Sequence, residues 1–377
     1  FTSIIRDEEG RKFSKSLNNS PDPLDVIHTY GADALRFTII YLAPIGQDIR
    51  YSNQKCEIGR NFATKIWNAA RFRNRYGFSA RANDNLEDIK TSNLRSDDQW
   101  ILARCNELIS QVTQALNNFY FHEATHTIYD FFWNEFCSWY LESCKSVFDE
   151  AESEVPCSMR VFDAVFSSFL RILHPFMPFV TEEVFHQLGF AEEDDSIMCA
   201  TWPKEWTTAD LERLGATEEQ KQLVIHKFEL IRGIRNIRTS YQIPPSTPIH
   251  TIVQPSDQKH TQFLHSEIDS IKTLTNATDV QVQDEQNSLT GPKATAVTSI
   301  GTAYVPLEGL IDIAAEKERL KTQEEKILSR IEKSETKLQN ENFLQRAPAE
   351  VVEKERQNLQ DQQDKLNRVR EHLAALE

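Results

Sequence analysis

The sequence has no long apolar run, and this absence excludes a transmembrane helix of the usual kind. A helix that crosses a bilayer needs about 20 consecutive, mainly apolar residues, and none of the 377 residues lie in such a stretch. Mean hydropathy is −0.51, with 40% hydrophobic and 26% charged residues, which is typical of a folded protein in water. The length predicts two or three domains.

Closely spaced cysteine pairs are also missing. No Cys-x-x-Cys occurs, which argues against a structural zinc site. Several cysteines lie in apolar helical patterns, where cysteine acts as a small buried hydrophobe, and we therefore expect a reducing, cytoplasmic setting. The chain has no signal peptide and begins at Phe1 rather than Met, so we expect a piece of a longer protein. The six cysteines are Cys56, Cys105, Cys137, Cys144, Cys157 and Cys199.

Positive charge is scarce overall but clustered. The net charge of −15 argues against a nucleic-acid partner when taken alone. However, eight Lys or Arg residues and a single acid lie between Arg50 and Arg81. Four more, with a single acid, lie between Lys227 and Arg238. Such patches on an acidic body could bind a polyanion locally while the protein stays soluble.

Hydrophobic periodicity predicts that the first two thirds of the chain are helical after a loop-rich start, residues 1–30. Ser96, Asp97 and Asp98 have the composition of an N-terminal cap for one of these helices. Pro44 ends the first helix, and Pro244 with Pro245 ends the helical region. The expected helices span 32–42, 58–75, 99–117, 121–148, 159–173, 178–188 and 217–238.

The periodicity changes after residue 248. Alternating residues in 249–253 and 280–283 and the β-branched run 294–305 predict strands, with a helix over 258–274 between them. We therefore expect a small α/β element over 249–306.

Two heptad stripes follow in the segment 307–377. The break around Pro348 predicts that they form an antiparallel coiled-coil hairpin, whereas one continuous dimerising helix would be kinked there. The predicted fold class is thus mainly α: a helical bundle (44–248) after a short first segment (1–43), a small α/β element, and a C-terminal hairpin. The stripes are Leu320, Ile327, Ile331 and Leu338, then Val352, Leu359, Leu366 and Leu373.

A cationic, hydroxyl-rich stretch, GRKFSKSLNNSPDPLDVI, occupies residues 10–27 and leads into YGADALRF. On its own, Lys-x-Ser-Lys-Ser indicates little more than a solvated loop. In this context it resembles the KMSKS region of class I aminoacyl-tRNA synthetases. Further stretches resemble the anticodon-binding domains of the valine, isoleucine and leucine subgroup: NFATKIWNAARF (61–72), WNEFCSWYLE (133–142), HPFMPFVTEEVF (174–185) and IRNIR (234–238).

The end of the chain favours the valine branch of that subgroup. Isoleucine enzymes typically finish with a cysteine-rich zinc region, which is absent, and leucine enzymes with a different compact domain. The coiled coil, with NFLQRAPAEVVEKER near its tip, resembles the arm of the valine enzymes. The resemblance implies a ligase that activates valine with ATP, accompanied by Mg²⁺, and joins it to tRNA(Val). We also expect a monomer with no membrane partner and no structural metal in this part.

The resemblance also assigns roles to the loop. Lys15 would be the main ATP-phosphate contact with help from Lys12, because lysines supply point charges where negative charge grows on pyrophosphate. Ser14 and Ser16 would bind phosphate or hold the loop. The family's His-Ile-Gly-His motif does not occur here, so we expect this chain alone not to aminoacylate.

Two loop positions depart from the family. Phe13 stands where Met is usual, and Phe can fill the same apolar slot. Asn18 stands where Gly is common, and Asn accepts a left-handed backbone better than most residues.

Two sets of residues are candidates for RNA contact. Lys65, Asn68 and Phe72, spaced i, i+3 and i+7, share a helix face that suits unstacked bases; alternatively Phe72 is core and Lys65 merely solvated. In the arm, whose family counterpart contacts the outer corner of tRNA, a solvated side chain is the favoured alternative for any single basic residue. The arm candidates are Arg330, Lys333, Arg346, Lys354 and Arg356.

Two other functions remain open from the sequence. One is an isoleucine enzyme that lacks its zinc region. The other is a non-catalytic helical protein whose coiled coil pairs with a partner, which would explain the acidic charge and the heptads but not the loop or the basic helix.

Overall fold

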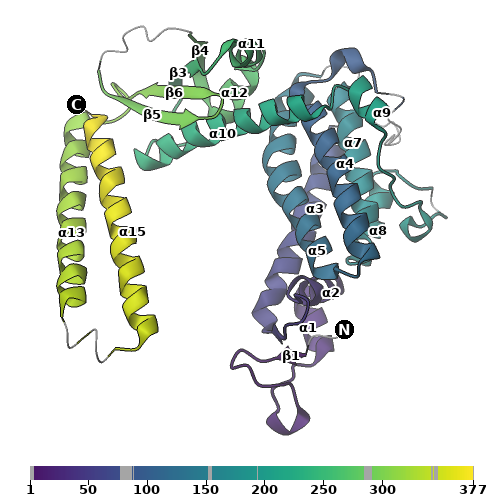
Figure 1. Cartoon of the computed structure of the whole chain (residues 1–377). Helices are drawn as coiled ribbons and strands as arrows, with labels where there is room; N and C mark the ends of the chain where they lie inside the picture. The colour runs from purple at the N-terminus through teal and green to yellow at the C-terminus, as the bar shows by residue number, and fades with distance from the viewer. Residues whose placement is uncertain are drawn as a thin grey trace. The chain divides into compact units, whose positions relative to one another are not determined.

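The computed structural model describes residues 4–76, 87, 89–151, 155–192, 194–283, 291–340, 343 and 347–376 (Figure 1). The chain divides into two compact units, Phe1–Val224 and Ile225–Glu377, and the division falls inside helix α10. Among the described residues, no helix is both long and apolar enough to cross a membrane.

The first unit begins with a two-stranded parallel sheet of β1 (Ile5–Arg6) and β2 (Ile49–Arg50). The turn η1 (Lys15–Leu17) and the helices α1 (Pro23–Tyr30) and α2 (Ala32–Tyr41) lie between these strands in the chain.

Helix α1 contradicts the expectation that residues 1–30 are mainly loop. Its N-cap is Asp22, whose Oδ1 accepts a hydrogen bond of 2.8 Å from the Leu24 N–H. Pro23 fits the first helical position because that position needs no N–H donor. Pro-Asp-Pro is therefore a helix start.

The bundle contains every helix that periodicity predicted in this region. Its core is aromatic: the rings of Phe132 and Phe169 stack 4.1 Å apart, and those of Phe136 and Phe162 lie 4.9 Å apart. The predicted helix over 121–148 is continuous but contains a π-helical segment that the sequence did not reveal. The elements are η2 (Asn53–Cys56), α3 (Glu57–Arg75), η4 (Thr91–Asn93), α4 (Ser96–Asn117), α5 (Phe121–Asp130), the π-helix η5 (Phe131–Tyr140), α6 (Leu141–Glu150), α7 (Cys157–Leu173), α8 (Pro178–Gln187), η6 (Ile197–Cys199) and α9 (Thr208–Arg213).

Helix α4 starts three residues earlier than predicted. Ser96, Asp97 and Asp98 form its first turn, and Arg95 occupies the cap position. The Arg95 N–H donates to Asp98 Oδ2 at 2.9 Å, so Asp98 caps the helix from inside its first turn.

The second unit contains a four-stranded sheet in the order β4-β3-β6-β5. Strand β3 pairs in parallel with β4 and antiparallel with β6, and β5 and β6 form an antiparallel hairpin. Gly301 is needed in this hairpin, because a Cβ atom there would lie 2.3 Å from the Gln254 carbonyl oxygen. The elements are α10 (Glu218–Ser240), which spans the division, β3 (Ile249–Pro255), α11 (Gln258–Ser266), α12 (Ile268–Thr275), β4 (Ala277–Val282), β5 (Lys293–Thr298) and β6 (Gly301–Pro306).

The prediction of a single helix over 258–274 was wrong. Glu267 separates α11 from α12, with φ −106° and ψ 6°. Its carboxylate accepts a hydrogen bond of 2.7 Å from the fully buried Lys227 of α10. The break therefore brings a counter-charge to a buried lysine, a requirement that local periodicity cannot show.

The C-terminal hairpin consists of α13 (Ile313–Gln339) and α15 (Ala349–Ala374), which lie side by side (Figure 1). Ion pairs Lys337–Glu355 (2.6 Å) and Arg370–Glu324 (2.7 Å) join them in antiparallel register. The predicted hairpin is confirmed over the continuous helix, and with it the mainly α fold class. The buried seam includes Leu320, Ile327, Ile331, Leu366 and Val369.

Candidate functional site

The loop after β1 presents its two lysines to solvent. The backbone of Lys12 forms an isolated antiparallel β-bridge with that of Arg6 in β1, and Lys15 begins the turn η1. Both side chains are exposed, and neither forms an ion pair with any residue that the structure describes. Two cations therefore stay available to an anion outside this chain.

The serines of the loop hold its shape. Ser14 Oγ accepts a hydrogen bond of 3.3 Å from the Leu17 N–H, and the Ser14 and Ser16 hydroxyls lie 3.1 Å apart. Asn18 ends the turn with φ 45° and ψ 34°, which confirms that Asn replaces Gly in the left-handed conformation.

Asp7 and Asn19 hold the loop on both sides, and sequence reasoning missed both. Asn19 Oδ1 accepts from the Ser14 N–H at 2.9 Å, while its Nδ2 donates to Asp7 Oδ2 at 2.9 Å. Arg11 donates to the same carboxylate from N and Nε, each at 2.7 Å. Burial alone would raise the pKa of Asp7, but the hydrogen bonds from Asn19 and Arg11 outweigh it and lower the pKa to about 2. An Asp and an Asn flanking a cationic loop are the signal that could have found this support.

Phe13 anchors the middle of the loop, as its apolar character predicted. Its ring packs edge-on against Tyr51, with centroids 6.1 Å apart, and belongs to a cluster with Val26, Ile49 and Cys56. The loop is thus fixed at Phe13 and Asp7 while both lysines remain exposed.

The α3 face proposed for RNA contact is only partly open. Asn68 is exposed, whereas Lys65 and Phe72 are half-buried. The Phe72 ring lies 5.8 Å from that of Phe148 and 6.2 Å from that of Phe162, so one side of it belongs to the core.

Some of the basic residues predicted to form patches are used internally. Arg73 is buried and binds Asp163 through two hydrogen bonds, 3.0 Å from Nε and 2.8 Å from Nη2. In the second cluster, Lys227 binds Glu267, and Arg235 donates to the Leu274 carbonyl oxygen at 2.7 Å.

Arg238 is also used inside the second unit. It is buried and donates to the carbonyl oxygens of Thr247 (2.7 Å), Thr275 (2.9 Å) and Asn276 (2.8 Å). Lys227, Arg235 and Arg238 therefore join the parts of the second unit and do not form the exposed patch that the sequence predicted. Arg232, the fourth residue of that cluster, is exposed.

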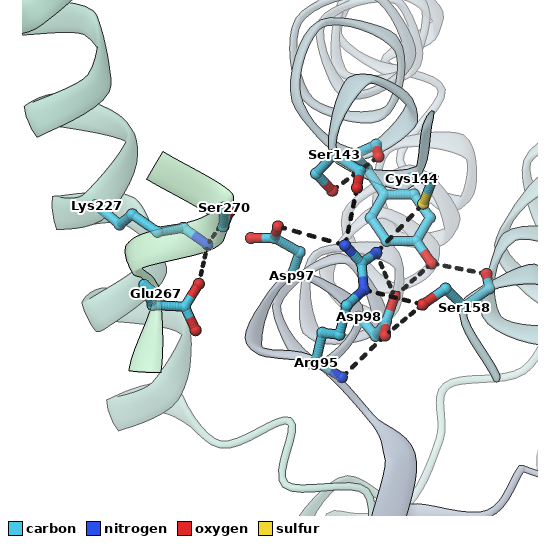
Figure 2. Close-up of polar contacts among 10 residues, drawn as sticks. Arg95, Asp97, Asp98, Ser143, Cys144, Ser158, Lys227, Glu267 and Ser270 are labelled. Atoms are coloured by element: carbon cyan, nitrogen blue, oxygen red, sulfur yellow. Dashed lines mark hydrogen bonds and ion pairs between the residues drawn. The ribbon is translucent and has the colours of Figure 1, made fainter. Parts of the chain in front are cut away.

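A polar network fixes three helical segments of the bundle (Figure 2). Asp98 is fully buried and accepts hydrogen bonds from Arg95 Nη2 (3.1 Å), Tyr140 Oη (2.8 Å) and Ser158 Oγ (2.8 Å). Burial raises the pKa of Tyr140 well above its ordinary value and that of Cys144 to about 12, so both stay neutral. The network connects α4 to the π-helical segment and to α7.

The arm candidates that the structure describes are solvent-exposed. Arg356 lies 4.0 Å from Glu353, whereas Arg330, Lys333 and Lys354 form no ion pair within the described part of the chain. Arg346 lies outside the described residues.

Three protein-family models match the chain in sequence. Residues 1–52 match the class I tRNA synthetases (I, L, M and V), and residues 98–253 match the anticodon-binding domain of tRNA ligase. Residues 312–377 match the valyl tRNA synthetase tRNA binding arm.

Curated relatives match over almost the whole chain. A valine--tRNA ligase of Thermotoga maritima is 39% identical over 99% of this chain and 40% of its own length. Those of Oceanobacillus iheyensis and Geobacillus stearothermophilus are 37% and 39% identical, each over 99% of this chain and 41% of its own length. The chain thus spans about two fifths of the length of these relatives. A solved LeuRS–tRNA complex of Agrobacterium radiobacter has 21% identity and a TM-score of 0.41 over 54% of this chain and 24% of its own, a likeness too low to support an argument.

Proposed function

Because the chain belongs to the valyl-tRNA synthetase family and corresponds to its C-terminal region, we propose that it forms part of an enzyme that activates valine with ATP and transfers it to tRNA(Val). The observation that carries this proposal is the order of the three matches: a class I segment that contains the lysine loop, an anticodon-binding bundle, and an arm of the valyl type. The arm favours valine over isoleucine specificity. The loop lysines, which have no described counter-charge, favour an enzyme over a non-catalytic coiled-coil protein.

In this proposal the loop supplies positive charge for the activation step. Lys15, assisted by Lys12, stabilises the negative charge that develops on the pyrophosphate leaving group. Ser14 and Ser16 hold the turn that orients Lys15, and Asp7 with Asn19 keeps the loop closed at its base. In this proposal Mg²⁺ accompanies ATP as part of the substrate. The described residues contain no group of three or more His, Cys, Asp or Glu that could hold a metal ion.

The rest of the chain would hold the tRNA. The exposed Asn68 and the open side of Phe72 would contact anticodon bases by hydrogen bonding and stacking, and Lys65 would bind a base edge or a phosphate beside them. Arg330, Lys333, Arg346, Lys354 and Arg356 would bind phosphates at the outer corner of the tRNA. The proposed divisions are 1–43 for the loop segment, 44–248 for the bundle, 249–306 for the α/β element and 307–377 for the arm, in a monomeric cytoplasmic protein.

Binding by the purified chain tests this proposal. It should bind a tRNA(Val) transcript more tightly than the same transcript with its anticodon changed, and the affinity should fall as salt rises because phosphate contacts release counterions. It should form no aminoacyl-adenylate from valine and ATP. Equal affinity for both transcripts would contradict the anticodon assignment, and adenylate formation would show that the chain holds a complete active site.

A further inference from the structure

The half-buried Trp133 of the π-helical segment lies against the face of α3 that carries Lys65. Its ring stacks on that of Tyr129, with centroids 5.3 Å apart and planes inclined by 12°. The Tyr129 ring in turn lies 4.9 Å from the fully buried Phe62 ring of α3. The indole therefore packs on Tyr129, which itself packs on the buried Phe62, and this packing fixes its position relative to α3.

The Trp133 ring holds a lysine. Lys65 Nζ lies 5.3 Å from the ring centroid, within the range of a cation–π interaction. Lys65 forms no ion pair with any residue in the described part of the chain, although it is half-buried. Two other cations of α3 have carboxylate partners, since Arg73 pairs with Asp163 and Arg60 lies 3.6 Å from Glu57. Arg75 also lies over a ring, that of Tyr76, but at the end of the helix.

An aromatic partner and a carboxylate partner have different consequences for a cation. Both restrict the ammonium group to one region, but a carboxylate also cancels its charge, whereas a neutral ring leaves the full positive charge for a third group. A free lysine side chain has high rotamer entropy and loses much of it when its ammonium group binds a phosphate or a base edge. An ammonium group that a ring already restricts loses less entropy on the same binding.

We propose that Trp133 is a positioning residue that holds the Lys65 ammonium in place for contact with tRNA. This inference rests on the proposed function, and it adds a residue from the π-helical segment to an interface that would otherwise come from α3. Trp133 acts through Lys65 and need not touch the RNA itself.

A graded series at position 133 tests the proposal in the whole chain. Binding of a tRNA(Val) transcript is measured for Trp133→Tyr, Trp133→Phe and Trp133→Leu, each alone and combined with Lys65→Met. Cation–π strength falls from Trp through Tyr and Phe to none in Leu. We expect affinity to fall in that order, by about 5- to 10-fold for Leu. In the Lys65→Met background the same changes should have almost no effect.

Salt dependence separates positioning from general destabilisation. Lys65→Met should lower the slope of log affinity against log salt by roughly one phosphate contact, about 0.7–0.9, and Trp133→Leu should lower it in the same direction. Lys145→Met is the matched control, because Lys145 is an exposed cation of α6 already paired with Glu142 at 2.7 Å, and it should leave the slope nearly unchanged. If the Leu variant does not fold, the Tyr and Phe variants carry the test.

The outcomes distinguish this inference from the proposed function. Equal losses at position 133 with and without Lys65, or no loss at all, would overturn the positioning role while anticodon-dependent binding by the wild type still supports the function. If the wild type does not discriminate between anticodons, the proposed function itself fails.

Discussion

Asp98→Ala should destabilise the first unit more than any surface substitution. The change removes a fully buried carboxylate that accepts from the Arg95 N–H and guanidinium, the Tyr140 hydroxyl and the Ser158 hydroxyl. Breaking a buried ion pair from one side costs about 3–5 kcal/mol when the remaining charge has no partner. Here the Arg95 side chain is 28% exposed and its Nη1 stays 4.0 Å from Asp97 Oδ2, which reduces the cost.

The expected loss in the free energy of unfolding lies at the lower end of that range. Arg95 keeps a hydrogen bond of 2.9 Å to the Ser143 carbonyl oxygen, and Tyr140 keeps one of 3.0 Å to that of Ser158. We therefore expect a loss of about 3 kcal/mol. For a unit of this size that corresponds to a decrease in Tm of about 6–12 °C.

Differential scanning calorimetry of the whole chain measures the effect. Asp98→Asn keeps the shape of the side chain but removes its charge. If the ion pair dominates, Asn should lower the free energy of unfolding nearly as much as Ala does. If the cavity left by Ala dominates, Asn should be nearly as stable as the wild type. Glu142→Ala is the control, because it breaks an exposed pair with Lys145 that contributes about 0–1 kcal/mol. A Tm decrease for Asp98→Ala no larger than that of the control would show that the Asp98 network contributes little to stability.

Three further changes test the loop and the arm. Lys15→Ala in the full-length enzyme should slow valine-dependent pyrophosphate exchange by about 10²–10³-fold; an unchanged rate would remove Lys15 from the ATP contact. Leu366→Glu would place a charge in the buried arm seam at a local cost of several kcal/mol, so tRNA binding should weaken while pyrophosphate exchange stays nearly intact; equal losses in both would show that the arm supports the catalytic fold instead. The pKa of Asp7 is lowered, so its hydrogen bonds to Asn19 and Arg11 stabilise the loop fully above the ordinary pKa of Asp and are lost as the pH falls toward about 2. An NMR titration should therefore give a midpoint near 2 for the Asp7 carboxyl, and this midpoint should rise in Asn19→Ala. A midpoint near 4 in the wild type would contradict the loop geometry.

Local patterns predicted the local structure well. The helices of the bundle, the strands after residue 248 and the heptad seam follow from residue periodicity alone, because burial on one face of an element repeats at that element's own period. The left-handed backbone of Asn18 could also be predicted, since it reflects the conformational preference of a single residue. The start of α1 could also have been read locally, from Asp22 and Pro23.

Contacts between distant residues could not be predicted. Lys227 and Arg238 look like surface cations in the sequence, yet a carboxylate and backbone carbonyls about 40 residues away surround them in the fold. Arg73 meets Asp163 across 90 residues. The loop lysines were recognisable as site candidates, but the support from Asp7 and Asn19 and the placement of Lys65 on Trp133 depend on tertiary packing.

Aminoacylation by the full-length parent protein is the most direct test of its specificity for valine. Purified enzyme and ATP are combined either with tRNA(Val) and radiolabelled valine or with tRNA(Ile) and radiolabelled isoleucine, and acid-precipitable aminoacyl-tRNA is counted. We expect valine to be attached to tRNA(Val) and isoleucine to give little product. Efficient attachment of isoleucine to its own tRNA, or no charging with either amino acid, would contradict it.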